Sequence, residues 1–353
     1  MRLQNGAMAP KQDIKTADLA TVLAALGQPA FRAGQVREWV FARGASSFDE
    51  MTNLPGALRD ELGKRFVIRT VSIGESVVSR DGTRRFTLRL ADGHVVESVL
   101  IPMGTSWTAC LSSQVGCRWR CSFCASGARG LVRNLTTGEI LDEALSMNAE
   151  APGGLRNVVF MGIGEPLDNY DNVIAAVRTI MAPPSAGLGV GARRVTISTC
   201  GVVPGIDRLA KEAMQVKLAV SLNAPDDERR TKLMPVNRKW PLRELLGACR
   251  RYVAATRKRV TFEYVLIGGV NDAPADAQKL ARLLRGMLCK VNVLCLNPHE
   301  LQPHGTVGRR AAHQFRLVLE KEGIEATVRA SKGADTAAAC GQLRLRDTRQ
   351  GGH

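Results

Sequence analysis

The feature of this sequence that most constrains its fold is an alternation of short apolar runs with helix-forming segments beyond residue 125. Six runs are rich in β-branched residues: NVVFMGIG, RRVTISTC, VKLAVSLN, RVTFEYVLI, KVNVLCLN and IEATVRAS. The segments between them mostly carry apolar residues at helical spacing, as in LTTGEILDEALSMNAE. A strand, a helix and another strand form a right-handed parallel crossover. The sequence therefore predicts an α/β fold, a partial (β/α)6 barrel of the TIM type, with its chemistry at the carboxyl ends of the strands.

Polar residues follow four of these predicted strands. They are Gly164 with Glu165, Ser198 with Thr199, Ser221 with Asn223, and Asn297. A single polar residue at a strand end is usually an ordinary turn or cap. Because the carboxyl ends of parallel strands meet at one edge of a barrel, four such groups together predict a cofactor cleft.

The chain before the barrel has a different pattern. Residues 13–67 carry apolar residues at helical spacing, and residues 68–101 alternate as β-strands around two Asp-Gly turns. We therefore expect a small helical domain and an antiparallel β-meander before the barrel. The predicted domains are an N-terminal helical, RNA-contacting domain (1–67), an antiparallel β linker or extension (68–104), the partial barrel (105–340) and a C-terminal tail (341–353).

The charge balance favours a polyanionic partner. The 353 residues include 49 Lys and Arg against 33 Asp and Glu, a formal net charge of +16. Nucleic acid is the first candidate partner for so basic a chain. No signal-peptide core and no apolar run of roughly 18 residues is present, so we expect a cytoplasmic protein without a membrane partner. Candidate phosphate contacts are Arg229, Arg230, Lys232, Arg257, Lys258, Arg259, Arg309, Arg310, Arg344 and Arg346.

The most specific motif is C-x3-C-x2-C, formed by Cys117, Cys121 and Cys124. Nine cysteines in a reducing compartment favour metal or redox chemistry over a disulfide framework. Thiolates select zinc or iron-sulfur clusters. A structural zinc site needs four protein ligands, and no second cysteine pair or nearby histidine follows the motif to complete such a site. A cubane cluster needs four iron ligands, so three cysteines leave one iron open to a substrate or cofactor.

With the aromatic Phe123 before its last cysteine, this motif resembles that of the radical S-adenosylmethionine (SAM) superfamily. Other segments, in order along nearly the whole chain, resemble the RlmN/Cfr family of RNA adenine methyltransferases. They are VESVLIP, CLSSQVGC, RNLTTGEI, MGIGEPLDNYDNV, RRVTISTCGVVPGIDRLA, SLNAPDDERR and ACGQL. The N-terminal phrase FRAGQVREWVFARGASSFDEMTNLP is similar to the RlmN branch.

The resemblance implies that residues 105–340 form a radical SAM partial barrel. It also implies a [4Fe-4S] cluster and SAM, with two SAM molecules used per turnover. The cluster ligands would be Cys117, Cys121 and Cys124. The matching SAM-binding positions are Gly164, Glu165, Ser198, Ser221, Leu222, Asn223 and Asn297. Two departures from the family pattern stand out: Asn223 replaces a frequent His, and Ala334 and Ala337 replace acidic residues near Cys340.

The resemblance also implies how a methyl group reaches C2 of adenine, a carbon that is too electron-poor for direct methyl transfer. Cys340 would take a methyl group from one SAM and lose a hydrogen atom to the 5'-deoxyadenosyl radical made from a second. Glu97 would accept the C2 proton, and Cys110 would release the product through a transient disulfide with Cys340. The remaining cysteines are expected to be small buried apolar residues: Cys200, Cys249, Cys289 and Cys295.

The expected activity is therefore methylation of adenosine C2 in the peptidyl-transferase region of 23S rRNA, and of adenosine 37 in tRNA. A flavodoxin-type electron donor and a monomeric state are also expected. The nearest alternative is the Cfr-type methylation of C8. An alternative of another class is a non-catalytic RNA-binding protein with structural zinc. A radical SAM activase of a partner protein fits the basic charge and the Cys110 and Cys340 pair poorly.

Overall fold

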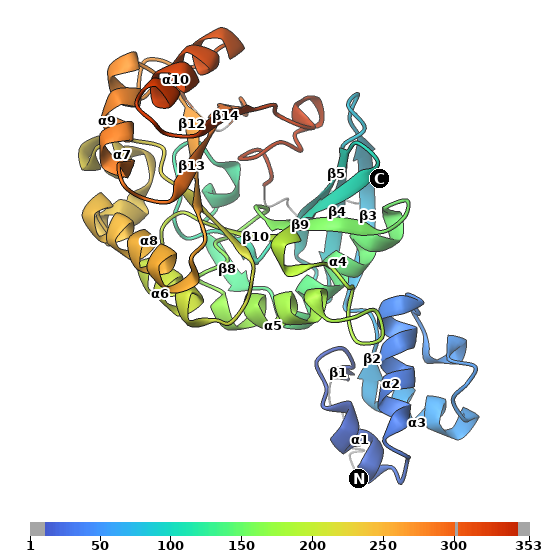
Figure 1. Cartoon of the computed structure of the whole chain (residues 1–353). Coiled ribbons are helices and arrows are strands. Elements are labelled where there is room, and N and C mark those ends of the chain that lie inside the picture. The colour runs from blue at the N-terminus through green and yellow to red at the C-terminus, as the bar shows by residue number, and fades with distance from the viewer. Residues whose placement is uncertain (1–10, 301–302, 345–353) are drawn as a thin grey trace, which may run out of the picture.

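The computed structural model describes residues 11–300 and 303–344 and is built around one ten-stranded mixed sheet (Figure 1). Its strand order is β14-β13-β12-β11-β10-β9-β6-β5-β4-β3. The parallel part comprises β6 (Ser106–Cys110), β9 (Leu155–Phe160), β10 (Val195–Thr199), β11 (Lys217–Ser221), β12 (Val260–Leu266), β13 (Cys289–Cys295) and β14 (Ala326–Arg329). The six strands predicted from the apolar runs correspond to β9 to β14, which confirms the α/β barrel fold.

The sequence did not indicate the seventh parallel strand, β6. This strand pairs in parallel with β9 and antiparallel with β5 (Val95–Met103). The meander of β3 (Val71–Val78), β4 (Arg84–Leu90) and β5 is therefore continuous with the barrel sheet. The exact domain boundaries given under Sequence analysis stay predictions.

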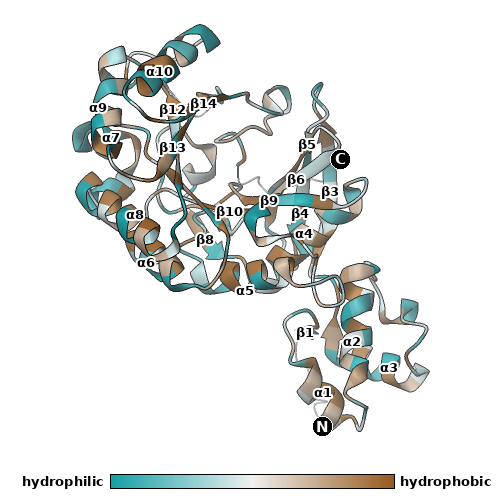
Figure 2. Cartoon of the chain, in the orientation of Figure 1, coloured by the Kyte–Doolittle hydropathy of each residue, from teal (hydrophilic) through white to brown (hydrophobic). Residues whose placement is uncertain are grey.

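Helices follow the parallel strands and cover the outside of the sheet (Figures 1 and 2). They are α4 (Thr137–Glu150), α5 (Tyr170–Met181), α6 (Val203–Lys211), α7 (Asp227–Leu233), α8 (Leu242–Thr256), α9 (Pro274–Leu284) and α10 (Arg309–Lys321). Successive side chains of each strand point alternately toward the helices outside the sheet and toward the inside of the barrel. On β9, Val158 is fully buried in the apolar core, whereas Asn157 and Val159 are half-buried and line an interior cavity.

The predicted N-terminal helical module is present and lies beside one end of the barrel (Figure 1). It contains α1 (Leu19–Ala25), α2 (Phe31–Arg37), α3 (Gly56–Arg65) and the parallel pair β1 (Gln12–Asp13) and β2 (Phe66–Val67). Asp142 on α4 holds the module: its Oδ1 lies 3.1 Å from Lys15 Nζ, and its Oδ2 accepts a 2.6 Å bond from the Thr70 amide. This buried carboxylate fixes the module against the sheet.

Short turns of helix complete the structure: η1 (Glu38–Ala42), η2 (Phe48–Glu50), η3 (Ala125–Gly127), η4 (Ala192–Arg194), η5 (Pro235–Arg238) and η6 (Ala334–Thr336). A two-stranded ribbon of β7 (Gln114–Gly116) and β8 (Leu131–Asn134) lies between β6 and α4 in the chain. Within the described residues, every helix is too short or too polar to cross a membrane.

Candidate active site

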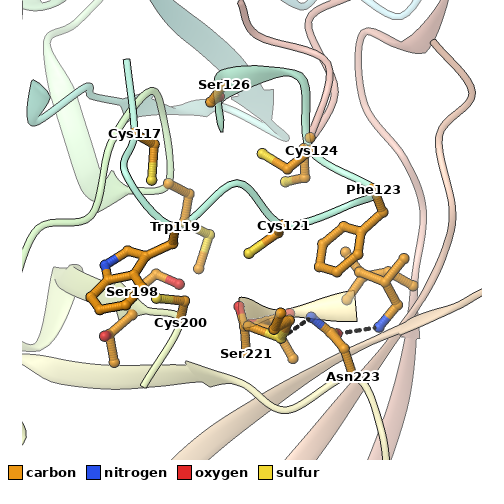
Figure 3. Close-up of a pocket in the computed structure, with 18 of the residues that line it drawn as sticks. Cys117, Trp119, Cys121, Phe123, Cys124, Ser126, Ser198, Cys200, Ser221 and Asn223 are labelled. Atoms are coloured by element: carbon orange, nitrogen blue, oxygen red, sulfur yellow. Dashed lines mark hydrogen bonds between the residues drawn. The ribbon is translucent and has the colours of Figure 1, made fainter. Parts of the chain in front are cut away.

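The three motif cysteines lie on the connection between β7 and β8, which we call the cysteine loop (residues 117–124). The loop begins at Gly116, whose φ of +78° favours glycine. A β-carbon there would overlap the Gly130 carbonyl oxygen, which accepts a 3.0 Å hydrogen bond from the Cys117 amide. The loop thus folds tightly back on itself, and its three sulfur atoms point toward a shared space (Figure 3).

The cysteine loop fits an iron-sulfur cluster. In the part of the chain that the structure describes, no three His, Cys, Asp or Glu side chains lie close enough together to form a metal-ion site. The sulfurs instead surround a space, as a cluster requires when each thiolate binds a different iron. Burial raises the pKa of Cys117 to about 12 and that of Cys121 well above its usual value. The positive charge of bound iron is what would keep such thiols deprotonated.

All three cysteines line one cavity of about 1040 Å³, which we call the cysteine cavity. The strand-end residues predicted to bind SAM mostly line it too: Gly164, Glu165, Ser198, Ser221, Asn223 and Asn297. Leu222 is the exception, because its side chain is fully buried in the apolar core. The structure thus brings the two predicted groups of residues together at the carboxyl ends of the parallel strands.

The Gly164-Glu165 turn is packed directly against β7. Gly164 has a φ of +106°, and a β-carbon there would lie 2.6 Å from the β-carbon of Gln114. Both carboxylate oxygens of Glu165 accept backbone hydrogen bonds, from the Cys200 amide at 2.7 Å and from the Leu167 amide at 3.0 Å. Burial raises the pKa of Glu165 to about 7. This side chain therefore fixes the turn on which it lies.

Asn223, the departure from the family pattern noted in the sequence, has a backbone conformation that suits Asn. Its φ is +56°, a left-handed conformation in which Asn is enriched. The side chain accepts a 2.8 Å bond from the Val265 amide and donates to the Met234 sulfur at 3.3 Å. Asn223 thereby holds part of the cavity wall.

Arg230 connects the ends of two strands beneath the cysteine cavity. It is fully buried and donates to the carbonyl oxygens of Cys200 at 2.7 Å and Ser221 at 3.1 Å. The assignment of this residue to RNA contact is therefore wrong, because its guanidinium is inaccessible. The neighbouring Arg229 is also engaged inside the protein, with Asp226 and Asp276.

Cys340 lies where the cysteine cavity meets a second cavity of about 1720 Å³ inside the barrel, the interior cavity. Cys110, at the end of β6, lines the interior cavity with it. Cys340 is exposed and its carbonyl accepts a 3.1 Å bond from Asn297 Nδ2, whereas Cys110 is buried. Burial, and next the neighbouring Cys340, raise the pKa of Cys110. All nine cysteines are free thiols in this structure.

Glu97 on β5 is completely buried and lines neither cavity. Its Oε1 accepts a 3.1 Å bond from Arg85, and its Oε2 accepts a 3.0 Å bond from the Arg344 amide. The segment after Cys340 is further held by a 2.7 Å bond from Ser126 Oγ to the Leu343 carbonyl. In this conformation the chain after Cys340 covers Glu97.

Two charged residues of the site were missed by sequence reasoning. Glu263 on β12 is 8% exposed and lines the cysteine cavity; its Oε1 accepts a 2.9 Å bond from Asn292. Its Oε2 is buried with no hydrogen-bond partner among the described residues. Arg329, which lines both cavities, lies 3.7 Å from Glu263. A charged residue at the centre of the apolar run VTFEYVL was the available signal.

Two cysteines predicted to be buried in the core also belong to the site. Cys200 and Cys295 are half-buried and line the cysteine cavity, because they lie at the carboxyl ends of β10 and β13. Of the other two, Cys249 is fully buried as predicted, whereas Cys289, at the start of β13, is half-buried.

The barrel and its cysteine loop define a radical SAM enzyme: residues 111–283 match the model of the Radical SAM superfamily. Residues 12–68 match the ribosomal RNA large subunit methyltransferase N-terminal domain. A radical SAM methyltransferase from Sphaerobacter thermophilus superimposes with a TM-score of 0.91 at 45% identity, covering 95% of this chain and 99% of that one.

Curated relatives show to which family of radical SAM enzymes the chain belongs. One is the probable dual-specificity RNA methyltransferase RlmN of Symbiobacterium thermophilum, 48% identical over 97% of this chain and 92% of the relative. Another is the dual-specificity RNA methyltransferase RlmN of Syntrophus aciditrophicus, 43% identical over 94% of this chain and 95% of the relative. The chain belongs to the RlmN family of radical SAM methyltransferases. Membership implies a [4Fe-4S] cluster and SAM as its cofactors.

Proposed function

We propose that this protein methylates C2 of adenosine in RNA, in the peptidyl-transferase region of 23S rRNA and at position 37 of tRNA, by way of a methylated Cys340. The observation that carries this proposal is the position of Cys340. It lies between the cysteine cavity, which holds the three predicted cluster ligands, and the interior cavity, which it shares with Cys110. A thiol placed there can meet both a methyl donor and a second thiol.

The cofactors and their ligands follow the family assignment. When bound, the cluster and two SAM molecules per turnover supply a methyl group and an organic radical. The cysteine loop would hold the cluster. The turn at Gly164 and Glu165, with Ser198, Ser221 and Asn297, would hold SAM, because these residues line the same cavity. Leu222 and Asn223 could take part only through their backbones, since both side chains are packed or bonded within the protein.

The protein's own residues then act in sequence. Cys340 accepts the methyl group as a thioether; the methyl carbon loses one hydrogen atom, and the resulting methylene carbon bonds to C2 of adenine. The redox centre that the cysteine loop would hold would take up the one electron that the adduct gives up. Glu97 takes the proton that leaves C2. Cys110, as a thiolate, attacks the Cys340 sulfur and a disulfide forms. The bond between the Cys340 sulfur and the methylene carbon breaks, and that carbon keeps the electron pair and takes up a proton, so that the methylated base leaves.

These reaction steps require two changes from the conformation of this structure. The segment after Cys340 must move away from Glu97, because the Arg344 amide now occupies the carboxylate. The Cys110 thiol must lose its proton although burial raises its pKa. We also propose a flavodoxin-type electron donor, a monomeric state and action in the cytoplasm.

The test is anaerobic reconstitution with iron, sulfide, SAM and a reductant, followed by incubation with protein-free 23S rRNA and with tRNA. We expect 2-methyladenosine in digests of both RNAs by nucleoside mass spectrometry. Formation of 8-methyladenosine alone would overturn the C2 assignment. SAM cleavage without any methylated adenosine would overturn the proposed RNA activity.

A further inference from the structure

The interior of this barrel is not a packed core. In a closed TIM barrel, branched apolar side chains from the strands fill the inside. Here the inward positions nearest the amino-terminal ends of the strands are polar, and Thr108, Asn157 and Thr196 line the interior cavity. The lining combines these hydrogen-bonding side chains with apolar ones such as Ile101, Val159 and Leu343, around a space of about 1720 Å³. Such a mixture suits a ligand with apolar faces and polar edges, and the mouth of a β-barrel is a common place for a ligand.

The interior cavity is also strongly basic. Its lining includes Arg194, Lys217, Arg329 and Lys332, and no Asp or Glu occurs among the described residues that line it. Arg194 directly precedes β10 and Lys217 begins β11; both are exposed. The register pairs Thr196 of β10 with Lys217 of β11, so Arg194, just before β10, and Lys217 both lie at the amino-terminal mouth of the barrel.

Two of the four cations that line the interior cavity are paired within the protein: Arg329 lies 3.7 Å from Glu263, and Lys332 lies 3.9 Å from Asp81. Within residues 11–300 and 303–344, Arg194 and Lys217 form no such ion pair, and the charge of Lys290 on the nearby strand β13 acts on Glu263. Partial burial, followed by the charges of Lys290 and Arg194, lowers the pKa of Lys217. Cations that repel one another around a cavity are stabilised when a polyanion binds between them.

The cysteine and interior cavities approach Cys340 from opposite ends of the barrel. The cysteine cavity lies at the carboxyl ends of the strands, and the interior cavity extends to their amino-terminal ends. Both include Met161, Leu294, Asn297, Arg329 and Cys340 in their linings. Ligands in the two cavities could therefore contact Cys340 without occupying the same space.

We propose that the target nucleotide enters through the amino-terminal mouth of the barrel, with Arg194 and Lys217 binding the phosphates that flank the extruded adenine. This inference rests on the proposed function and adds where the RNA binds. An enzyme that acts on a base must take it out of the stack. Phosphate contacts at the mouth hold the strand while the base extends along the interior cavity to Cys340 and Cys110.

The test is the double charge reversal Arg194→Glu with Lys217→Glu in the reconstituted holoenzyme. Its matched control is Arg243→Glu with Arg250→Glu, two exposed cations on the outer face of α8. RNA affinity is measured with a 23S rRNA fragment and a tRNA anticodon stem-loop over a series of salt concentrations. Methylation of Cys340 without RNA is followed by mass spectrometry of the protein.

We expect the mouth variant to bind RNA at least roughly tenfold more weakly, with the slope of log K against log salt smaller by about 0.7 to 0.9 for each phosphate that the protein no longer neutralises. Methylation of Cys340 should stay as in the wild type, because the cysteine cavity is untouched. The α8 control should keep its affinity and slope.

Unchanged affinity and slope in the mouth variant would overturn this inference, as would an equal loss in the control, which would show only an effect of net charge. RNA binding is measured apart from methylation. A wild type that binds RNA through the mouth but never methylates it would therefore refute the proposed activity and leave the docking site standing.

Discussion

Replacing Arg230 with Met should destabilise the protein and loosen the cysteine cavity. The Arg230 guanidinium is fully buried and donates to the carbonyls of Leu222, Cys200 and Ser221 and to the Asn237 side chain, at 2.7 to 3.1 Å. Methionine fills much of the same volume but leaves these acceptors without their donor. The substitution thus isolates the polar contribution of the guanidinium.

The magnitude follows from two opposing terms. A hydrogen bond to a charged group contributes about 1.5 to 3 kcal/mol, and several acceptors lose their donor at once. The same burial that lowers the pKa of Arg230 is a desolvation cost, which the variant recovers. The bonds outweigh that cost because no new polar partner replaces the guanidinium. We therefore expect the free energy of unfolding to fall by about 3 to 5 kcal/mol.

The assay is urea unfolding under anaerobic conditions, together with SAM binding by equilibrium dialysis. SAM affinity should fall as well, since the Cys200 and Ser221 carbonyls lie at the ends of the strands that frame the cavity. The control is Lys232→Met on the same helix, an exposed cation paired with Glu228, which should cost about 0 to 1 kcal/mol. A loss below about 1 kcal/mol in the Arg230 variant would refute the reasoning.

Four further predictions follow from the site. Alanine at any cysteine of the motif should abolish iron binding and SAM cleavage, and an iron assay that finds a full cluster would refute the ligand assignment. Cys110→Ala should accumulate a protein-RNA adduct on denaturing gels that disappears when Cys340 is also replaced; normal turnover would exclude the resolving role. Gly164→Ala should weaken SAM binding strongly and lower the free energy of unfolding by about 1 to 3 kcal/mol. Its control is Gly93→Ala: Gly93 also has a positive φ but no neighbouring atoms, so this variant measures the cost of the backbone conformation alone. Burial raises the pKa of Glu143, on α4, from 4.5 to about 8. The folded chain therefore holds this proton more tightly than the unfolded chain, and the free energy of unfolding should fall as the pH rises from about 4.5 to about 8. Glu143→Gln should flatten the dependence in urea unfolding, and an unchanged slope would contradict this assignment.

Local patterns were sufficient to predict the fold class. Six β-branched runs separated by helical segments predicted six of the seven parallel strands, because period and handedness are properties of contiguous sequence. The strand β6 was missed because its segment, SWTAC, is short, and its place depends on pairing with β5 and β9. The spacing of the three cysteines and the ordered family segments likewise needed no coordinates.

The tertiary structure decided which way each charged side chain faces and what it meets. Arg230 and Lys217 are both basic residues in the sequence, yet one is buried under two strand ends and the other lines an open cavity. That difference depends on strand register and on partners far away in the chain, which no local pattern records. Packing also decided where the last described residues of the chain lie against the first strands of the sheet. This packing places Cys340 at the junction of the two cavities, and it places the segment after Cys340 over Glu97.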